Sequence, residues 1–402
     1  MRGKVTAVSS PSVCRMLLAG VLLATAAIVV HAQGTADAQA AARHAAARAA
    51  ANMKFIRWVT GSLYRVQYGA GEGYQQMVYV TPAGIILTDT NSTADAQWLK
   101  EQLAQRFPGK PVRYIIMSHY HFDHALGTQV FPDAKVVSSD ETVKKLKSLN
   151  LRYAPPPGNS TDLDGDNRFS RSEARNFLVP EFEQFDTNKD GYVDAAELNA
   201  GIHVPDITFT GRMTLRLGDS RVELIERPGR SGGVGGMVDS YFPDEKVLFL
   251  NDYLPPHRVY PGWANFDHAP LDEWIAAIDQ LQSLDFLMFV SSHWDDGTKQ
   301  DLVDLGRFYR DLQTAVSQGI AAGQSQAQLE HSVKLEAYGD WDDYGTNLTA
   351  NIDSAYNLET LYRDCASMGI ALPASKPGPG VNHPAVCYFG PGAAQVPSAT
   401  HQ

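Results

Sequence analysis

The sequence predicts a mixed α/β fold, a layered sandwich with sheets on the inside and helices on the outside. Three observations lead to this prediction. Apolar and polar residues alternate in the first part of the chain, short buried strands alternate there with helical periods, and long helical patterns dominate from residue 271 onward. The chain has 402 residues, 44% hydrophobic and 20% charged, so it can bury a large core, which excludes a disordered or fibrous protein.

The first elements are expected to be antiparallel strands within residues 55–87. Stretches such as Leu63–Tyr68 and Met77–Val80 alternate between apolar and polar side chains, and Gly-rich turns separate them. A helical period follows at Ala94–Phe107, and an apolar run predicts a buried strand at Val112–Met117.

The later elements are interrupted by an insertion. A strand at Lys135–Ser138 and a helix at Asp140–Leu149 precede a Pro-rich break at 154–158. We interpret residues 155–202 as inserted, because the parts on either side are complete only together. Beyond the insertion we expect strands at Ile207, Leu215, Val222–Ile225 and Val247–Leu250, and helices at Leu271–Leu284 and Leu302–Ala322.

The first residues have the features of a cleaved signal peptide. Arg2, Lys4 and Arg15 precede an apolar run, and small residues end it near Ala32. The run is too short to span a bilayer comfortably. We therefore expect a secreted or periplasmic protein with no stable membrane anchor after signal cleavage.

Two cysteines follow the signal peptide, Cys365 and Cys387, and in an exported chain such a pair is more often a disulfide than a metal site. This completes the expected organisation of the chain. It comprises a signal peptide at 1–32, an Ala-rich tether at 33–54, the main fold at 55–154 and 203–360, the insertion at 155–202, and a C-terminal tail with the disulfide at 361–402.

The chain is acidic, with a net charge of −11, and the insertion holds ten acidic against four basic residues. Nucleic-acid binding requires Lys and Arg clustered toward phosphates, and the sequence has no such cluster. We therefore expect a small-molecule substrate and no nucleic-acid partner. The sequence gives no prediction of oligomeric state.

A dense group of metal-binding side chains follows the strand at Val112–Met117. His119, His121, Asp123 and His124 place three imidazoles and a carboxylate within six residues. Burying so many polar groups is costly without a shared partner. His119 and His121 leave the strand on the same side and are expected to face one ion, with Asp123 and His124 facing another. Imidazole suits zinc or iron, and the carboxylate keeps iron and manganese as alternatives.

This segment resembles the signature of the metallo-β-lactamase superfamily, His-x-His-x-Asp-His after a strand. Asp89 after its apolar strand, Gly127, and Pro243–Phe249 followed by Asp252 extend the resemblance over nearly all of 55–360 outside the insertion. It implies an αββα sandwich that binds one or two zinc ions. It also implies that His119 and His121 hold one metal with a third histidine, that Asp123, His124 and His293 hold the second, and that Asp252 bridges both.

The chain departs from the family at the third histidine. Where Pro-Gly-His is expected, the chain has Arg230, and no ligand is present from there to Gly233. Three explanations follow, in order of preference. The chain uses a single metal at the second site, or His257 or His268 completes the first site, or Arg230 places a guanidinium where a metal charge would lie.

Two twelve-residue loops in the insertion follow the EF-hand pattern of calcium sites. Oxygen side chains stand at positions one, three, five, nine and twelve, and position seven would contribute its backbone carbonyl. The second loop has Gly191 at position six, whereas the first has Asn167, which tolerates positive φ and allows weaker binding. The expected calcium-binding residues are Asp162, Asp164, Asp166, Arg168, Ser170 and Glu173 in the first loop, and Asp186, Asn188, Asp190, Tyr192, Asp194 and Glu197 in the second.

These observations together predict a secreted metal-dependent hydrolase. A metal-bound hydroxide would attack an ester, thioester, amide or lactam, Asp123 would orient the water or take its proton, and calcium would have a mainly structural role. Two alternatives stay open. One is a calcium-binding secreted protein on a catalytically impaired scaffold, and the other is an iron-dependent oxidoreductase of the same fold.

Overall fold

The structure is a computed structural model of the chain. It describes residues 53–69, 74–148, 163–174, 182–183, 185–228, 235–252, 254–259 and 271–367. The chain divides into two compact units, Met1–Met53 and Lys54–Gln402, and every helix and strand given below lies in the second. Outside the described residues lie the expected signal peptide, most of the tether, Asp162, Arg230, His268, Cys387 and the side chain of Cys365.

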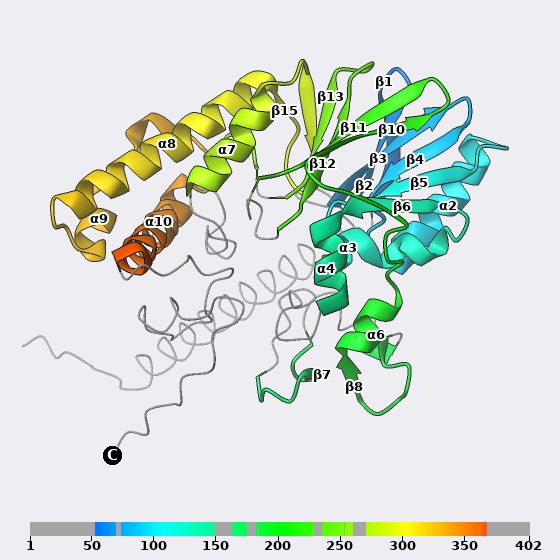
Figure 1. The fold of residues 1–402 in the computed structure, drawn as a ribbon, viewed down its shortest axis with the longest axis horizontal. Coiled ribbons are helices and arrows are strands. Elements are labelled where there is room, and N and C mark those ends of the chain that lie inside the picture. Colours follow the sequence, from blue (N-terminus) through cyan, green and yellow to red (C-terminus); the bar gives the residue numbers. More distant parts are fainter. Residues whose placement is uncertain are drawn as a thin grey trace, which may run out of the picture. The chain divides into compact units, whose positions relative to one another are not determined.

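The first sheet has seven strands in the order β1-β2-β3-β4-β5-β6-β9 (Figure 1). The strands from β1 to β4 are antiparallel, and β4, β5, β6 and β9 pair in parallel. Parallel strands end at the same edge of a sheet, so the residues after β4 and β5 are neighbours. The strands are β1 (Lys54–Thr60), β2 (Leu63–Tyr68), β3 (Tyr74–Thr81), β4 (Gly84–Thr88), β5 (Val112–Ile116), β6 (Lys135–Ser139) and β9 (Ile207–Phe209).

The second sheet has six strands in the order β10-β11-β12-β13-β14-β15. All neighbours are antiparallel except β13 and β14, which are parallel. The strands are β10 (Arg212–Leu217), β11 (Ser220–Glu226), β12 (Val238–Phe242), β13 (Val247–Leu250), β14 (Met288–Ser291) and β15 (Gly297–Thr298).

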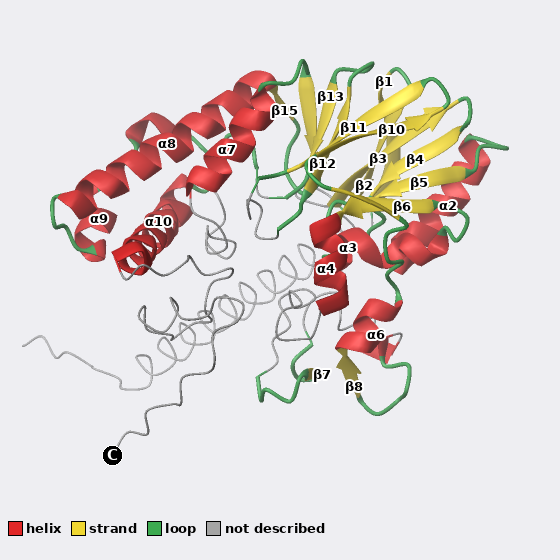
Figure 2. Ribbon diagram, in the orientation of Figure 1, coloured by secondary structure: helices red, strands yellow, loops and turns green. Residues whose placement is uncertain are grey.

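Helices flank the two sheets (Figure 2). Side chains cap the start of three of them. Ser92 accepts a hydrogen bond from Asp95 N at α2, and reciprocal capping boxes form between Thr298 and Asp301 at α8 and between Ser325 and Gln328 at α9. No helix in the described ranges is both long and apolar enough to cross a membrane. The helices are α2 (Thr93–Arg106), α3 (Phe122–Ala125), η1 (Leu126–Val130), α4 (Asp140–Ser148), α6 (Ala195–Ala200), α7 (Leu271–Gln282), α8 (Lys299–Ala321), α9 (Gln326–Ser332), η4 (Glu336–Tyr338) and α10 (Tyr344–Ser367).

Three hydrophobic clusters define the layers. One lies between the sheets and joins Met77 and Ile86 of the first sheet to Leu224 and Phe249 of the second. Another packs the opposite face of the first sheet, including Ile85, against α2 and α3. The third packs the second sheet against α7, α8 and α10. Adjacent strand residues such as Ile85 and Ile86 thus face different layers. The predicted sandwich of helix, sheet, sheet and helix is confirmed.

The insertion shares its core with the main fold. Its strands β7 (Arg168–Ser170) and β8 (Tyr192–Asp194) form a two-stranded antiparallel sheet in which Phe169 faces Val193. Both side chains are buried, and with Leu198 of α6 they belong to the cluster that also packs α2 and α3. The insertion therefore packs directly on the layer that carries the His-rich segment.

Most expected elements occur close to their predicted bounds, but several observed elements were not predicted, among them β12, β14, α9 and α10. β12 could not be predicted because Asp239 and Ser240 interrupt its apolar pattern, although both are buried. α10 continues to Ser367 and so crosses the boundary expected between the main fold and the C-terminal tail.

Gly127 allows η1 to approach α2 closely. A Cβ at this position would lie 2.4 Å from Ala96 Cβ and 2.8 Å from Thr90 O. We expect Gly127→Ala to lower the free energy of unfolding by about 1–3 kcal/mol through overpacking, as measured by urea denaturation. Gly345→Ala is the control, because a Cβ there meets nothing within 4 Å. Equal stability of the two variants would contradict the close packing.

Candidate metal centre

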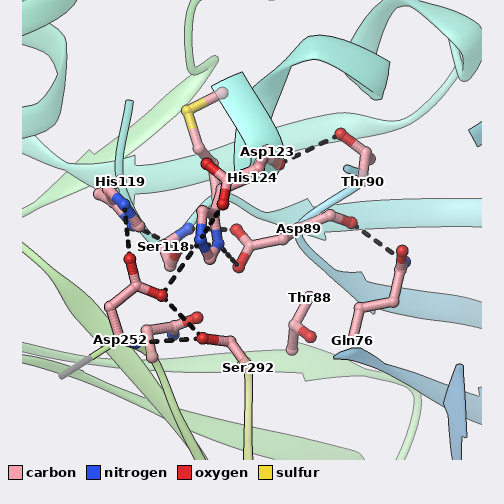
Figure 3. Close-up of polar contacts among 12 residues, drawn as sticks. Gln76, Thr88, Asp89, Thr90, Ser118, His119, Asp123, His124, Asp252 and Ser292 are labelled. Atoms are coloured by element: carbon pink, nitrogen blue, oxygen red, sulfur yellow. Dashed lines mark hydrogen bonds and ion pairs between the residues drawn. The ribbon is translucent and has the colours of Figure 1, made fainter. Parts of the chain in front are cut away.

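Polar side chains from both sheets meet where strands end. In Figure 3, His119 and His124 from the segment after β5 face Asp252, which follows β13. His293, which follows β14, lies at the same place, with Nε2 3.2 Å from His124 Nε2. Each sheet has a parallel pair at this point, β4 with β5 and β13 with β14, and the ligands follow the carboxyl ends of these strands.

Two groups of ligand atoms lie close enough to share an ion. His119, His124 and Asp252 form one group, and Asp123, His124 and His293 form the other, with one ligand atom of each residue within 4.8 Å of the rest. Asp252 Oδ1 lies 3.2 Å from His124 Nε2, and Asp123 Oδ2 lies 3.1 Å from His293 Nε2. The two groups form one continuous centre, because His124 belongs to both.

His121 belongs to neither group. The resemblance pairs it with His119 at one ion, and its ring does pack against the His119 ring, with centroids 4.3 Å apart. The structure instead combines His119 with His124 and Asp252. The other five expected ligands all lie within the two groups.

His257 does not replace the missing third histidine. Its Nε2 lies 2.9 Å from Asp301 Oδ1, and its ring stacks on Trp341. The hypothesis that His257 completes the first site is therefore wrong. The corresponding hypotheses for His268 and Arg230 concern positions outside the described residues.

The donor atoms fit a divalent metal ion. His119 is fully buried, and its Nε2 has no hydrogen-bond partner in the described part of the chain. This nitrogen lies 3.4 Å from Asp252 Oδ2, and the Nε2 atoms of His124 and His293 face each other at 3.2 Å. Buried polar atoms in this arrangement are costly unless they share a cation. Imidazole nitrogens with carboxylate oxygens suit zinc, iron or manganese.

Asp89 fixes the orientation of His124. It is fully buried after β4, its Oδ2 lies 2.9 Å from His124 Nδ1, and its Oδ1 accepts a hydrogen bond from Ser118 N at 2.7 Å. A carboxylate at Nδ1 keeps the proton on that nitrogen, which leaves the lone pair of Nε2 for a metal. Asp89 is part of the family resemblance, but this role was not predicted for it.

A buried ion pair holds the segment that carries Asp252. Arg227 Nε lies 2.6 Å from Asp239 Oδ2, and the guanidinium also donates to the backbone oxygens of Asn251 and Asp252. Ser292 Oγ donates to Asp252 Oδ1 at 2.8 Å. Neither Arg227 nor Asp239 was predicted from the sequence. The only hint in the sequence was Asp239, a charged residue within the otherwise mostly apolar segment that forms β12.

Opposite charges set the pKa values in the centre. Burial disfavours the charged form of Asp252, but His124 and His293 outweigh this effect and lower its pKa well below the usual range. Burial opposes charge on His124 as well, yet the surrounding carboxylates raise its pKa well above the usual value. Burial lowers the pKa of His119 and His121, which favours their neutral, ligating form. A bound cation would displace protons from the charged imidazoles.

Tyr74, at the start of β3, also belongs to the centre. Its ring lies edge-on to two ligands, with centroids 5.2 Å from His124 and 5.6 Å from His293. The hydroxyl is buried and has no hydrogen-bond partner within the described ranges. Burial raises its pKa well above the usual value, with further contributions from Asp89 and Asp123. Tyr74 could not be recognised from the sequence, because no local pattern separates it from the other strand aromatics.

The two acidic loops of the insertion have matching backbone hydrogen bonds. In each, the glutamate at position twelve accepts from the N–H groups of positions two and nine, and the aspartate at position five accepts from position seven. Asn167 has a φ of +67°, the conformation predicted for it in place of glycine. The Arg168 guanidinium lies 3.0 Å from Asp166 and 3.9 Å from Asp190, so it spans both loops.

The sequence profile of the metallo-beta-lactamase superfamily matches residues 70–293, a range that includes every candidate ligand of the centre. A curated relative, the 2,4-dinitroanisole O-demethylase subunit alpha of Nocardioides sp. (strain JS1661), is 24% identical over 219 residues. The match covers 52% of this chain and 49% of the relative. The chain thus spans about half the length of the curated relative that it matches.

A solved alkylsulfatase structure shares the fold. The stereoselective inverting sec-alkylsulfatase Pisa1 from Pseudomonas sp. is 16% identical, with a TM-score of 0.54, over 79% of this chain and 55% of that one. A metallo-beta-lactamase from Pontibacter korlensis is 18% identical, with a TM-score of 0.44, over 64% of this chain and 99% of that one. At such identities the alkylsulfatase likeness concerns the fold alone.

The Asp89–His124 contact leads to a prediction about metal affinity. Asp89→Asn fits the positive φ of +54° at this position, but an amide no longer holds the Nδ1 proton of His124 as a carboxylate does. We expect zinc affinity to fall by about 10–100-fold, measured by titration against a competing chelator. Asp133→Asn, in an exposed turn, serves as the control. Unchanged zinc affinity in Asp89→Asn would show that Asp89 does not position His124.

Proposed function

Because the chain belongs to the metallo-β-lactamase superfamily, we propose that it is a metal-dependent hydrolase of a small-molecule ester, thioester, amide or lactam. The observation that carries the proposal is the convergence of buried His119, His124 and Asp252 beside Asp123 and His293. When bound, a divalent metal ion lowers the pKa of a water molecule and polarises the oxygen of the substrate.

The contacts favour one tightly bound ion in each chain. Asp89 engages Nδ1 of His124, so only Nε2 of that residue can ligate a metal, and one nitrogen ligates one ion. His124 belongs to both ligand groups, and its Nε2 lies 3.2 Å from Asp252 Oδ1 in one and 3.2 Å from His293 Nε2 in the other. We propose zinc as the ion, with iron and manganese as alternatives that the same donors would accept.

Asp123 is proposed as the catalytic carboxylate. Its side chain is 38% exposed, compared with 25% for His293, 8% for Asp252 and 0% for His124. A substrate would therefore approach from the side of Asp123 and His293. There the Asp123 carboxylate would orient the attacking water and accept its proton.

Hydrolysis can be tested with zinc-loaded protein and 4-nitrophenyl acetate. We expect Asp123→Asn to lower kcat/KM by about 10²–10⁴-fold, because the amide cannot accept a proton. Release of 4-nitrophenolate and zinc content are measured on the same samples, and Asp133→Asn is again the control. Absence of bound transition metal in the wild type, or full activity of Asp123→Asn, would contradict the proposal. Two tightly bound equivalents of zinc would contradict the single-ion form.

Removal of a methyl group from an aryl ether is a second candidate reaction. It is favoured by the curated relative, whose name is that of an O-demethylase subunit. An iron-dependent oxidoreductase and a calcium-binding protein with an impaired centre remain further alternatives. Bound iron with oxygen consumption would favour the oxidoreductase, and calcium binding without any transition metal would favour the impaired scaffold.

We also propose that loops 162–173 and 186–197 each bind a calcium ion. Three observations support this proposal: the repeated pattern of oxygen side chains, the matching hydrogen bonds in both loops, and the pairing of β7 with β8. Export, proposed from the pattern of residues 1–32, would place these loops where calcium is abundant. A structural role is then favoured over sensing.

A series of contacts leads from the second loop to the helix that carries two ligands of the metal centre. Glu197 lies in the first turn of α6, and Leu198 of that helix is buried in the cluster that packs α3. Beyond α6, His203 N donates to Thr128 Oγ1 at 2.8 Å, and Thr128 Oγ1 donates to Ala125 O at 2.8 Å. Ala125 ends α3, the helix that carries two ligands. Calcium in this loop would therefore support the position of those ligands.

Calcium binding is testable by calorimetry and thermal unfolding. At a calcium concentration a hundredfold above Kd, each site would add about 2.7 kcal/mol to the free energy of unfolding, and the Tm rises accordingly. We expect Glu197→Gln to lose one site and part of the Tm increase, whereas Glu336→Gln, exposed on η4, should behave as the wild type. A wild-type Tm that does not respond to millimolar calcium would refute the structural role.

A further inference from the structure

Tyr74 has a buried polar atom that the proposed function does not use. Its side chain is only 7% exposed, its ring packs against both His124 and His293, and its hydroxyl meets no hydrogen-bond partner among the described residues. A buried hydroxyl without a partner destabilises a folded chain. Such groups are rare in native proteins and call for an explanation.

The backbone next to Tyr74 is fixed to the segment that carries His293. Gln75 N donates to Ser292 O at 2.6 Å, and Gln75 Nε2 donates to Trp294 O at 2.9 Å. These two hydrogen bonds flank His293 on both sides. The residue next to Tyr74 is therefore tied to the His293 segment by one backbone and one side-chain hydrogen bond.

The other polar groups around this part of the centre are acceptors or are already engaged. Asp123 and Asp252 offer only oxygen acceptors, and the Nε2 atoms of His124 and His293 face the ligand cluster. A phenol is an O–H donor at neutral pH. Donors held in place for a developing negative charge lower a reaction barrier.

We propose that Tyr74 donates a hydrogen bond from its hydroxyl to the substrate oxygen on which negative charge develops. This inference rests on the proposed hydrolase function. The ligand class is an ester or another molecule that presents an oxyanion during the reaction.

The test uses the full chain loaded with Co²⁺ and inorganic phosphate as the oxyanion probe. Phosphate binding is followed through the visible spectrum of the bound Co²⁺. We expect Tyr74→Phe to bind Co²⁺ as the wild type does, but to bind phosphate about 10–100-fold more weakly, because one hydrogen bond to a charged oxygen is lost. The kcat for 4-nitrophenyl acetate should fall in parallel.

Thermal unfolding separates this role from a packing role. Tyr74→Phe keeps the ring and removes a hydroxyl that has no partner, so its Tm should equal or exceed that of the wild type. Tyr68→Phe is the matched control, because the Tyr68 hydroxyl donates to Gln76 Oε1 at 3.0 Å. That variant should lose stability and retain phosphate binding.

The outcomes distinguish this inference from the proposed function. Wild-type protein that takes up no transition metal would overturn the hydrolase proposal and with it the basis of this inference. If the metal-loaded wild type does not bind phosphate, only the role of Tyr74 is overturned, because the centre would then not bind the oxyanion to which the Tyr74 hydroxyl is proposed to donate. Equal phosphate affinity in the wild type and Tyr74→Phe would do the same.

Discussion

His124 joins the two sheets through its two ring nitrogens. Nδ1 faces Asp89, which follows β4 of the first sheet, and Nε2 faces Asp252, which follows β13 of the second. Both carboxylates are buried, and either one alone would be expensive to remove from water. The positive charge between them offsets that cost, whether it is a proton or a metal ion. Since each sheet supplies only part of the set, the centre forms only when the sandwich is assembled.

The groups around the centre divide into two kinds. The supporting groups have their hydrogen-bond partners within the protein, as in the pair of Arg227 with Asp239 and the contact of Ser292 with Asp252. Two groups that face the centre differ: His119 Nε2 and Tyr74 Oη have no hydrogen-bond partner among the described residues. In functional sites, supporting residues with all their hydrogen bonds formed typically surround groups that have none. Such sites give up some local stability so that these groups can bind a ligand.

Local patterns were sufficient to predict the layers and most of the ligands. The His-rich segment is short, and its residues meet because they are neighbours in sequence. Asp252 and His293 required the family resemblance, since nothing in their own surroundings marks them as ligands. Tyr74 and Arg227 could not be predicted, because their roles arise from contacts between segments far apart in the chain. The grouping of His119 with His124, instead of His121, likewise depends on where the opposite sheet places Asp252.

The pairing of β6 with β9 has a consequence for how the chain folds. β9 is the outermost strand of the first sheet, and the whole insertion lies between it and its partner. Closing so long a connection is entropically unfavourable, and such non-local pairings slow folding. A folded insertion brings the ends of that connection closer together, because Leu198 packs beneath α3 while Asp206 donates its N–H to Val136 O. A folded insertion would therefore lower the entropic cost of pairing β9 with β6.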